Sequence, residues 1–144
     1  MELSCKSEYA LLALIVLRDH YLDAEPVQIR QIAMQQNIPD RYLEQLLAVL
    51  RRSGLVRSQR GARGGYSLAR EPWQITLLEV INCIEGRDIT APIGEPAETT
   101  ERIAIREVWQ RACSQMSEVF RGCTLQELCD RRDDRQTSQL MYYI

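Results

Sequence analysis

Arginine and glycine are concentrated in residues 57–70, whose sequence is RSQRGARGGYSLAR. Four of these fourteen residues are Arg, three are Gly and none is acidic, although the chain of 144 residues carries a net charge of −2. Guanidinium groups pair with phosphates and with guanine edges, and glycine permits tight turns and close backbone approach. The segment therefore either meets a negatively charged partner or forms a solvated loop.

The charge of the chain is divided between two consecutive stretches. Residues 41–70 hold seven arginines against one glutamate, whereas residues 71–101 hold seven acidic residues against one arginine. A pI of about 5.5 therefore does not argue against a polyanionic partner, because the positive charge is local. A solvated charged face is the alternative interpretation, and the surrounding elements have to decide between the two.

The residues before this segment predict a helix-turn-helix. Helical spacing of apolar residues predicts helices over 28–36 and 41–53, separated by the sequence NIPD at 37–40. Asn37 tolerates the left-handed conformation, and Asp40 is a candidate cap for the second helix, which Gly54 would end. Two helices joined by a turn of about four residues are typical of this motif but also of simple helical hairpins.

A predicted β-hairpin follows the second helix. Residues 55–56 and 66–68 are expected to form short strands, and the connection between them carries Arg60 and Arg63 among glycines. The order of helix, turn, helix and basic hairpin is that of a winged helix-turn-helix. The glycines allow the wing to turn tightly, and the arginines lie where a phosphate backbone or a minor groove would be.

The rest of the chain predicts further helices. Residues 2–20 form a helix that is apolar on nearly all sides, which predicts burial on two sides, one of them supplied by a partner subunit. A short helix is expected over 75–85 and a loop over 88–100. A final short helix over 124–132 would precede a polar tail.

A long amphipathic helix is predicted from Thr99 or Thr100 to about residue 121. Its apolar stripe lies far from the winged-helix core and needs another surface to cover it, for which a second copy of the chain is the simplest candidate. The predicted dimerisation residues are Ile105, Trp109, Ala112, Met116 and Val119.

Several stretches together resemble the Rrf2 family of bacterial winged-helix transcription regulators. They are SEYALLALIVL, IRQIAMQQNIPDRYLEQLLAVLRRSGLV, SQRGARGGYSLAR and ITLLEVINCIEG, in this order and spacing. The match covers residues 3–86 closely and the long helix more loosely. The resemblance implies a homodimer on double-stranded DNA, with the second helix of the motif in the major groove and the wing at the minor groove.

The resemblance also assigns candidate DNA contacts. By position, Arg41, Glu44 and Gln45 match the base-facing residues of the family, and Arg60 matches the arginine of the wing. Arginine prefers guanine edges, glutamine prefers adenine edges, and arginine enters narrow minor grooves, so the side-chain chemistry agrees. The remaining candidates are expected to contact phosphates: Arg51, Arg52, Ser58 and Arg63. For Arg51 and Arg52 the alternative is that they are solvated cations, which are favourable at the C-terminal end of a helix.

The chain departs from the family at the site of its iron–sulfur cluster. Relatives that bind a cluster carry three closely spaced cysteines before the long helix, but residues 88–107 contain none here, and Arg106 stands where some relatives have a histidine. A thiolate-ligated cluster needs ligands that converge on one point. No metal or cofactor is therefore predicted. The remaining alternative is an atypical cluster held by Glu8, at a position where some relatives supply a carboxylate from the partner subunit, and by Cys113 of the long helix.

The fold class expected is mainly α, a winged helix-turn-helix with a two-stranded β wing plus a long C-terminal dimerisation helix. The predicted organisation is a DNA-binding domain over 1–86, a loop over 87–100, the dimerisation helix and a short helix over 101–137, and a tail over 138–144. Five cysteines without CxxC spacing do not suggest a disulfide framework.

The expected function is that of a bacterial, cytoplasmic, sequence-specific DNA-binding regulator that acts as a homodimer on a roughly palindromic operator. No signal peptide and no membrane segment are recognised, so no membrane partner is expected. An enzyme is not expected, because the single histidine and the absence of a phosphate-binding loop leave little for catalysis. The alternatives are a winged helix that binds protein or RNA, and a regulator that senses through an atypical iron–sulfur cluster.

Overall fold

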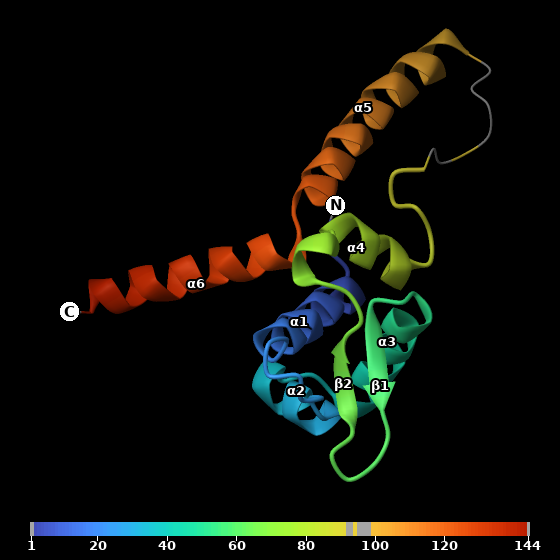
Figure 1. Cartoon of the computed structure of the whole chain (residues 1–144). Coiled ribbons are helices and arrows are strands. Elements are labelled where there is room, and N and C mark those ends of the chain that lie inside the picture. Colours follow the sequence, from blue (N-terminus) through green and yellow to red (C-terminus); the bar gives the residue numbers. More distant parts are fainter. Residues whose placement is uncertain (1, 92–93, 95–98, 144) are drawn as a thin grey trace.

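The computed structural model describes residues 2–91, 94 and 99–143 (Figure 1). Helices dominate this part of the chain, and a two-stranded antiparallel sheet follows the first three of them, as predicted. The elements in chain order are α1 (Cys5–Asp19), α2 (Ile29–Gln36), α3 (Asp40–Arg52), β1 (Val56–Gln59), β2 (Gly65–Leu68), the 3-10 helix η1 (Pro72–Gln74), α4 (Leu77–Glu85), α5 (Thr100–Gly122) and α6 (Leu125–Tyr142).

Helix α1 forms the centre of the core. The Ser4 hydroxyl caps it by accepting a hydrogen bond from the backbone N–H of Ser7 at 3.1 Å. Contacts with α2, α3, α4, α6 and β2 surround the helix, and Leu14 and Leu17 are almost completely buried. The predicted burial on two sides is therefore confirmed, but elements of the same chain provide it and no partner subunit is needed.

The turn between α2 and α3 follows the sequence signals closely. Asn37 has φ 53° and ends α2 in the left-handed conformation, and Gly54, with φ 75°, follows the last turn of α3. The prediction that Asp40 caps α3 is wrong. Pro39 is the cap residue and Asp40 lies in the first turn, where its negative charge still favours the positive end of the helix dipole.

The wing is attached to the segment that precedes α2. Strands β1 and β2 pair with Val56 opposite Leu68 and Gln59 opposite Gly65. Tyr66 in β2 also exchanges two backbone hydrogen bonds of 2.8 Å with Val27, so a third segment joins the edge of the hairpin. This bridge fixes the wing relative to α2, and the predicted hairpin is confirmed with a longer first strand.

The junction between α5 and α6 is joined to the segment before α4 by backbone hydrogen bonds. The N–H of Leu77 donates to the carbonyl of Cys123 at 2.9 Å, and the N–H of Leu125 donates to the carbonyl of Ile75 at 2.8 Å. From this junction α5 and α6 leave the rest of the chain in different directions (Figure 1). The end of α5 and the start of α6 are therefore attached at one point to the winged helix-turn-helix.

The predicted short last helix over 124–132 is wrong in length, since α6 continues to Tyr142. Thr124 and Glu127 form a reciprocal capping box at its start, and no glycine or proline interrupts residues 125–142. The helix therefore continues into the range assigned to a polar tail, because nothing in these residues ends it. Residue 144 of that range lies outside the described residues, as do 92–93 and 95–98 of the predicted loop.

An ion-pair network connects the base of α6 to the end of α1. Arg132 donates to both carboxylate oxygens of Asp19 at 2.7 and 2.8 Å. Burial raises the pKa of Asp19, but the hydrogen bonds from Arg132 and Arg18 outweigh this effect and leave its pKa below the ordinary value. The direction of α6 is thus fixed near the core. No helix in the described parts of the chain is long and apolar enough to cross a membrane.

The close approach of the wing to the 26–28 segment predicts a steric effect at Gly65. A Cβ atom there would lie 2.5 Å from the carbonyl oxygen of Val27, a backbone atom that cannot move without breaking the bridge. Gly65→Ala is expected to lower the free energy of unfolding by about 1–3 kcal/mol. Urea unfolding followed by circular dichroism measures the change.

The matched control is Gly122→Ala, since a Cβ atom at Gly122 meets nothing within 4 Å. This control is expected to leave the stability unchanged or to raise it slightly, because alanine favours helix. Equal unfolding midpoints for Gly65→Ala and the wild type would contradict the proposed role of the close contact.

Candidate nucleic-acid interface

Helix α3 has one buried and one exposed face. Its inner face is fixed in the core by four leucines that are at most 4% exposed: Leu43, Leu46, Leu47 and Leu50. The three predicted base contacts, Arg41, Glu44 and Gln45, are all exposed near its N-terminal end. Arg41 and Gln45 are four residues apart, so they lie on the same side of the helix.

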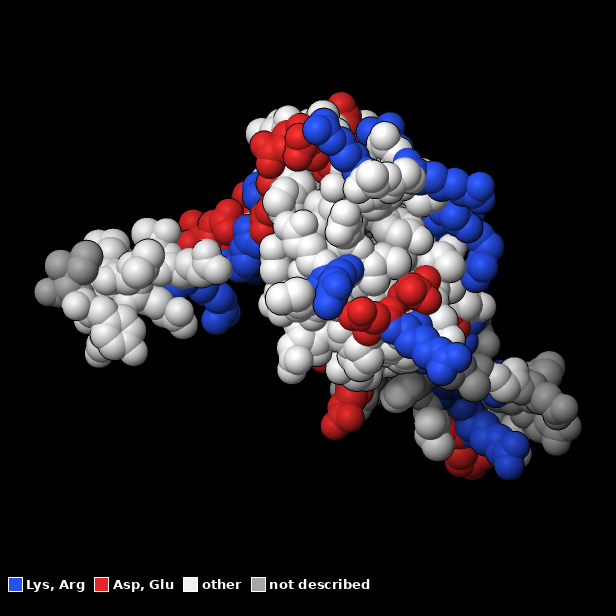
Figure 2. Space-filling model, turned by 90° about the horizontal axis from the view of Figure 1, so that it is seen from below, with Lys and Arg blue, Asp and Glu red and all other residues white. Residues whose placement is uncertain are grey.

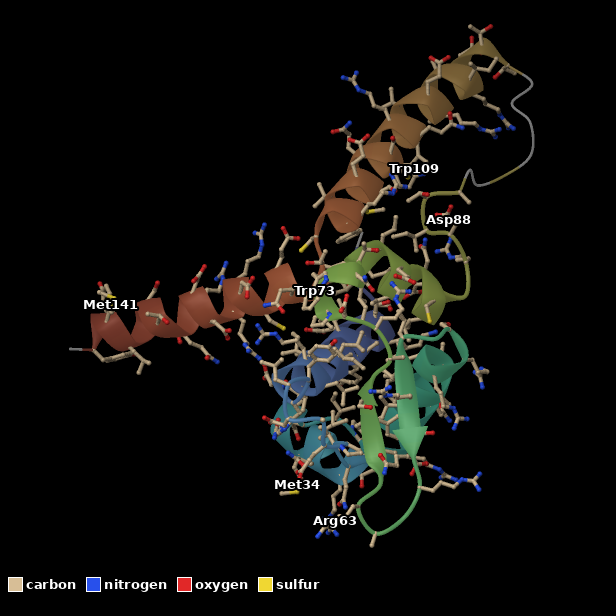
Figure 3. All side chains as sticks on the ribbon, in the orientation of Figure 1. Met34, Arg63, Trp73, Asp88, Trp109 and Met141 are labelled. Atoms are coloured by element: carbon tan, nitrogen blue, oxygen red, sulfur yellow. The ribbon has the colours of Figure 1, made fainter. Side chains whose placement is uncertain are left out.

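The tip of the wing is a glycine-rich turn with two exposed arginines, Arg60 and Arg63. The N–H of Gly64 donates to the carbonyl of Gly61 at 2.9 Å, and a Cβ atom on Gly64 would lie 2.3 Å from the carbonyl oxygen of Gln59. Only glycine therefore fits this turn. Arg63 lies with Met34 of α2 at the end of the molecule remote from α5 and α6 (Figure 3).

Helix α3 and the wing are held together by side-chain and backbone contacts. The Nη1 atom of Arg51 donates to the hydroxyl of Ser58 in β1 at 3.2 Å. The N–H of Leu55 donates to the carbonyl of Leu50, which connects the helix to the start of the hairpin. Arg51 and Ser58, two of the predicted phosphate contacts, are thus hydrogen-bonded to each other within the protein.

The structure divides the arginines of the positive stretch into exposed and paired groups. Arg52 is exposed, as are the other predicted contacts, whereas Arg70 donates two hydrogen bonds to Glu79 of α4 at 2.6 and 2.9 Å. The hydrogen bond to Glu79 raises the pKa of Arg70 above its ordinary value. The charge of Arg70 is therefore balanced within the protein, which the sequence did not reveal.

Two further arginines were not among the predicted contacts. Arg57 of β1 is exposed and donates from Nε to the hydroxyl of Ser67 across the hairpin at 3.1 Å. Arg30 is exposed in the first turn of α2. The sequence offered one indication of Arg30 as a contact: it lies at the start of the first helix of the predicted helix-turn-helix.

The charges seen from the wing end are mixed. Figure 2 shows several Lys and Arg side chains on this face, with acidic side chains between them. Glu44 contributes one exposed carboxylate beside Gln45. A carboxylate near DNA repels phosphates unless it accepts a hydrogen bond from a cytosine amino group. The arginines of this face would therefore attract any DNA, whereas Glu44 would favour a cytosine opposite it.

The predicted dimerisation residues of α5 all lie on one side of the helix, but they differ in their surroundings. Ile105 and Val119 are 71% and 69% exposed, and Ala112 is exposed between them. Val108, which the sequence prediction did not include, is 72% exposed and extends the same stripe. Trp109 and Met116 instead line a pocket that α5 shares with α4, where Cys113 is buried.

The atypical cluster, with Glu8 supplied by a partner subunit and Cys113 by α5, is not tested by the arrangement within one chain. Glu8 is exposed on α1, whereas Cys113 is buried against α4, and no group of three His, Cys, Asp or Glu side chains converges within the described residues. Arg106 and the sequence of 88–107 supply no thiolate. Taken within one chain, these residues do not fit an iron–sulfur cluster.

Comparison with known proteins gives a consistent result. Residues 3–131 match the Rrf2 family, described as iron-dependent transcriptional regulators. The chain is 38% identical over 144 residues to the HTH-type transcriptional regulator CymR of Bacillus subtilis, with 99% of each chain covered. It is 34% identical over 145 residues to the regulator IscR of Yersinia enterocolitica, covering 96% of this chain and 88% of the relative.

Solved structures show the same fold at similar sequence identity. The structure of B. subtilis CymR, named as a global cysteine regulator, superposes with a TM-score of 0.80 at 34% identity, covering 91% of this chain and 98% of the other. The IscR of T. potens superposes with a TM-score of 0.79 at 33% identity, covering 94% and 91%. These proteins are regulators and not enzymes, and the chain belongs to the Rrf2 family of transcriptional regulators.

Proposed function

We propose that this regulator binds DNA as a homodimer and reads a roughly palindromic operator. The observation that carries the proposal is the pair of elements held in one frame, α3 with its exposed N-terminal end and the wing with its exposed arginines. Two such frames related by a twofold axis meet DNA about one helical turn apart, or a multiple of it. The exposed side chains then differ in what they recognise.

The side chains at the start of α3 are assigned to base recognition. Arg41 suits the O6 and N7 acceptors of guanine, Gln45 suits adenine, and Glu44 suits the amino group of cytosine. All three side chains are exposed and lie at the end of the recognition helix that usually reaches base edges. Arg60 in the wing is assigned to the adjacent minor groove, where narrow grooves concentrate negative potential.

Side chains at the end of α3 and in the wing are assigned to phosphate contacts. Four exposed side chains are assigned to them: Ser58 and Arg63 in the hairpin, and Arg51 and Arg52 at the end of α3. The hydrogen bond between Arg51 and Ser58 orients both toward one location. Such contacts supply affinity without sequence preference and make it depend on salt.

The homodimer is inferred from the outer stripe of α5, defined as Ile105, Val108, Ala112 and Val119. Three of these side chains are about 70% exposed, and they recur at steps of three, four and seven residues. Apolar residues at this spacing pack well against a second helix of the same kind. A second copy would bury the stripe and place two winged domains on one DNA molecule.

We further infer that the protein functions without the cluster that the family description implies. The converging ligands that a cluster requires are missing from the described residues, and residues 88–107 hold no cysteine. The regulator therefore detects its signal by other means.

The first prediction distinguishes base reading from phosphate contact. Gln45→Ala is expected to relax preference at particular base pairs in each half-site, at a cost of about 1–3 kcal/mol for a lost bidentate contact. Arg63→Ala is expected to weaken all sequences almost uniformly and to reduce the salt slope by about one. Selection of sites from a randomised DNA pool, with binding measured over a salt series, compares both variants with the wild type.

An unchanged selected motif for Gln45→Ala would show that α3 does not read bases through this side chain. Weak salt dependence of the wild type would favour a protein partner instead of nucleic acid. The control is Arg135→Ala, which removes an exposed arginine of α6 and is expected to leave both motif and affinity unchanged.

The second prediction concerns the oligomeric state. Light scattering after size exclusion is expected to give twice the chain mass of 16.7 kDa. Val108→Asp is expected to shift the protein toward the monomer, because a carboxylate within the outer stripe would be buried in the dimer without a partner. Ile103→Asp is the control, since Ile103 is partly exposed but lies about 200° from Ile105 around the helix.

The third prediction concerns iron. Protein purified without oxygen is expected to contain no stoichiometric iron and no visible absorption from a cluster, and to bind its operator equally well after chelation. Stoichiometric iron with acid-labile sulfide would refute this expectation and direct attention to Cys113 and its neighbours.

A further inference from the structure

A pocket of about 450 Å³ lies between α4, α5 and the segment before α1. Its walls are mainly apolar and include Ile81 of α4 and Trp109, Met116 and Phe120 of α5. Ligand pockets in proteins usually have volumes of about 300–1,000 Å³, with apolar walls and a few placed polar groups. The size and the lining of this pocket therefore suit a small molecule.

A carboxylate is held rigidly at one wall of the pocket. The Oε1 atom of Glu85 accepts hydrogen bonds from the hydroxyl of Ser7 at 2.7 Å and from the hydroxyl of Ser4. These hydrogen bonds, led by that of Ser4, keep the pKa of Glu85 below its ordinary value, so the group stays charged near neutral pH. The second oxygen, Oε2, has no hydrogen-bond donor within the described residues.

A guanidinium lies on the same pocket, two residues further along the chain. Arg87 follows Gly86, which ends α4 in the left-handed conformation with φ 68°. Arg87 is exposed and makes no hydrogen bond or ion pair with the parts of the chain that the structure describes. The pocket thus combines apolar walls with the fixed carboxylate of Glu85, the exposed carboxylate of Glu2 and the available guanidinium of Arg87.

These charges restrict the chemistry of a ligand. A purely anionic molecule would pair with Arg87 but would be repelled by Glu85, and a purely cationic molecule would meet the reverse situation. A molecule that carries both an ammonium and a carboxylate pairs with Glu85 and with Arg87, while the exposed carboxylate of Glu2 stays in solvent. The apolar walls around Trp109 and Phe120 favour an apolar side chain on the same molecule.

We propose that this pocket is an effector site for a zwitterionic small molecule with an apolar side chain, of the class of apolar amino acids and their dipeptides. The ammonium pairs with Glu85, the carboxylate pairs with Arg87, and the side chain packs on Trp109, Met116 and Phe120. The pocket lies on the α4 side of α5, marked by the buried Cys113, and the exposed outer stripe remains available for a second copy.

A ligand in the pocket would contact both α4 of the winged domain and α5. A ligand that binds one spacing of these helices better than another changes the affinity for DNA by the same factor by which DNA changes the affinity for the ligand. This regulatory consequence rests on the proposed DNA binding, whereas ligand binding itself does not.

The binding test uses the fluorescence of Trp109. The chain contains two tryptophans, so Trp73→Phe leaves Trp109 in the pocket wall as the only indole. This full-length variant is titrated with L-leucine, L-phenylalanine and the dipeptide Leu-Leu. A saturable change is expected for at least one of them, and no saturable change for any of the three would overturn the proposal.

Two analogues of leucine test the need for both charges. 4-Methylpentanoate lacks the ammonium and 3-methylbutylamine lacks the carboxylate, while both keep the branched apolar chain. Each is expected to bind at least about ten-fold more weakly than leucine or its dipeptide. Equal binding of either analogue would refute the assignment of a zwitterion.

Substitutions locate the site. Glu85→Gln retains an acceptor for Ser4 and Ser7 but removes the charge, and Arg87→Ala alters only an exposed side chain, so both variants are expected to fold. Each should weaken binding of the best zwitterion about ten-fold or more. The matched controls are Glu101→Gln and Arg135→Ala, exposed charges outside the pocket, and equal weakening by a control would overturn the location.

The regulatory step is tested separately with selected operator DNA. A saturating concentration of the best ligand is expected to change the operator affinity of the wild type several-fold and to leave that of Arg87→Ala nearly unchanged. Saturable ligand binding with no change in operator affinity would overturn the effector role. Failure of the ligand-free protein to bind any DNA would instead refute the proposed function, while the fluorescence test of the pocket still stands.

Discussion

Burial of α1 is the interaction on which the rest of the structure depends. This helix contacts α2, α3, α4, α6 and β2, so the elements of the winged domain and the base of the C-terminal arm share one apolar support. Each fully buried leucine contributes about 1.5–3 kcal/mol relative to exposure. Because both sides of α1 are covered within one chain, each protomer can hold its DNA-facing surface in shape before any second copy joins it.

Periodicity in the sequence was enough to predict most of the fold. The leucines of α3 recur at helical spacing, Asn37 and Gly54 supply left-handed residues at helix ends, and glycines mark the wing. The full length of α6 was not predictable in this way, since residues 133–139 are all polar and give no apolar stripe that would identify a helix beyond residue 132. Its stability comes from local propensity, the capping box and the ion pairs of Arg132.

The sequence was enough to predict which residues are candidates for the site. It was not enough to predict which of their charges are paired with other groups of the protein. Arg70 and Arg60 are equivalent in a count of charges, yet Arg70 is paired with Glu79 and Arg60 is exposed. Pairing across nine residues, between the end of the wing and α4, depends on how the chain folds back, which sequence spacing does not specify. The same reason explains why the sequence did not distinguish Trp109 and Met116 from the other apolar residues of α5: only the fold shows that these two side chains also line the pocket shared with α4.

Helix α4 is the physical connection between the two ends of the molecule. Its Glu79 holds Arg70 at the end of the wing, its Ile81 and Glu85 line the pocket, and the segment before it is hydrogen-bonded to the α5–α6 junction. A small displacement of α4 relative to α5 would therefore also move the base of the wing, because Glu79 of α4 is paired with Arg70 there. Coupling of this kind requires two discrete packings of α4, and a pocket at its interface with α5 is the place where a ligand could favour one of them.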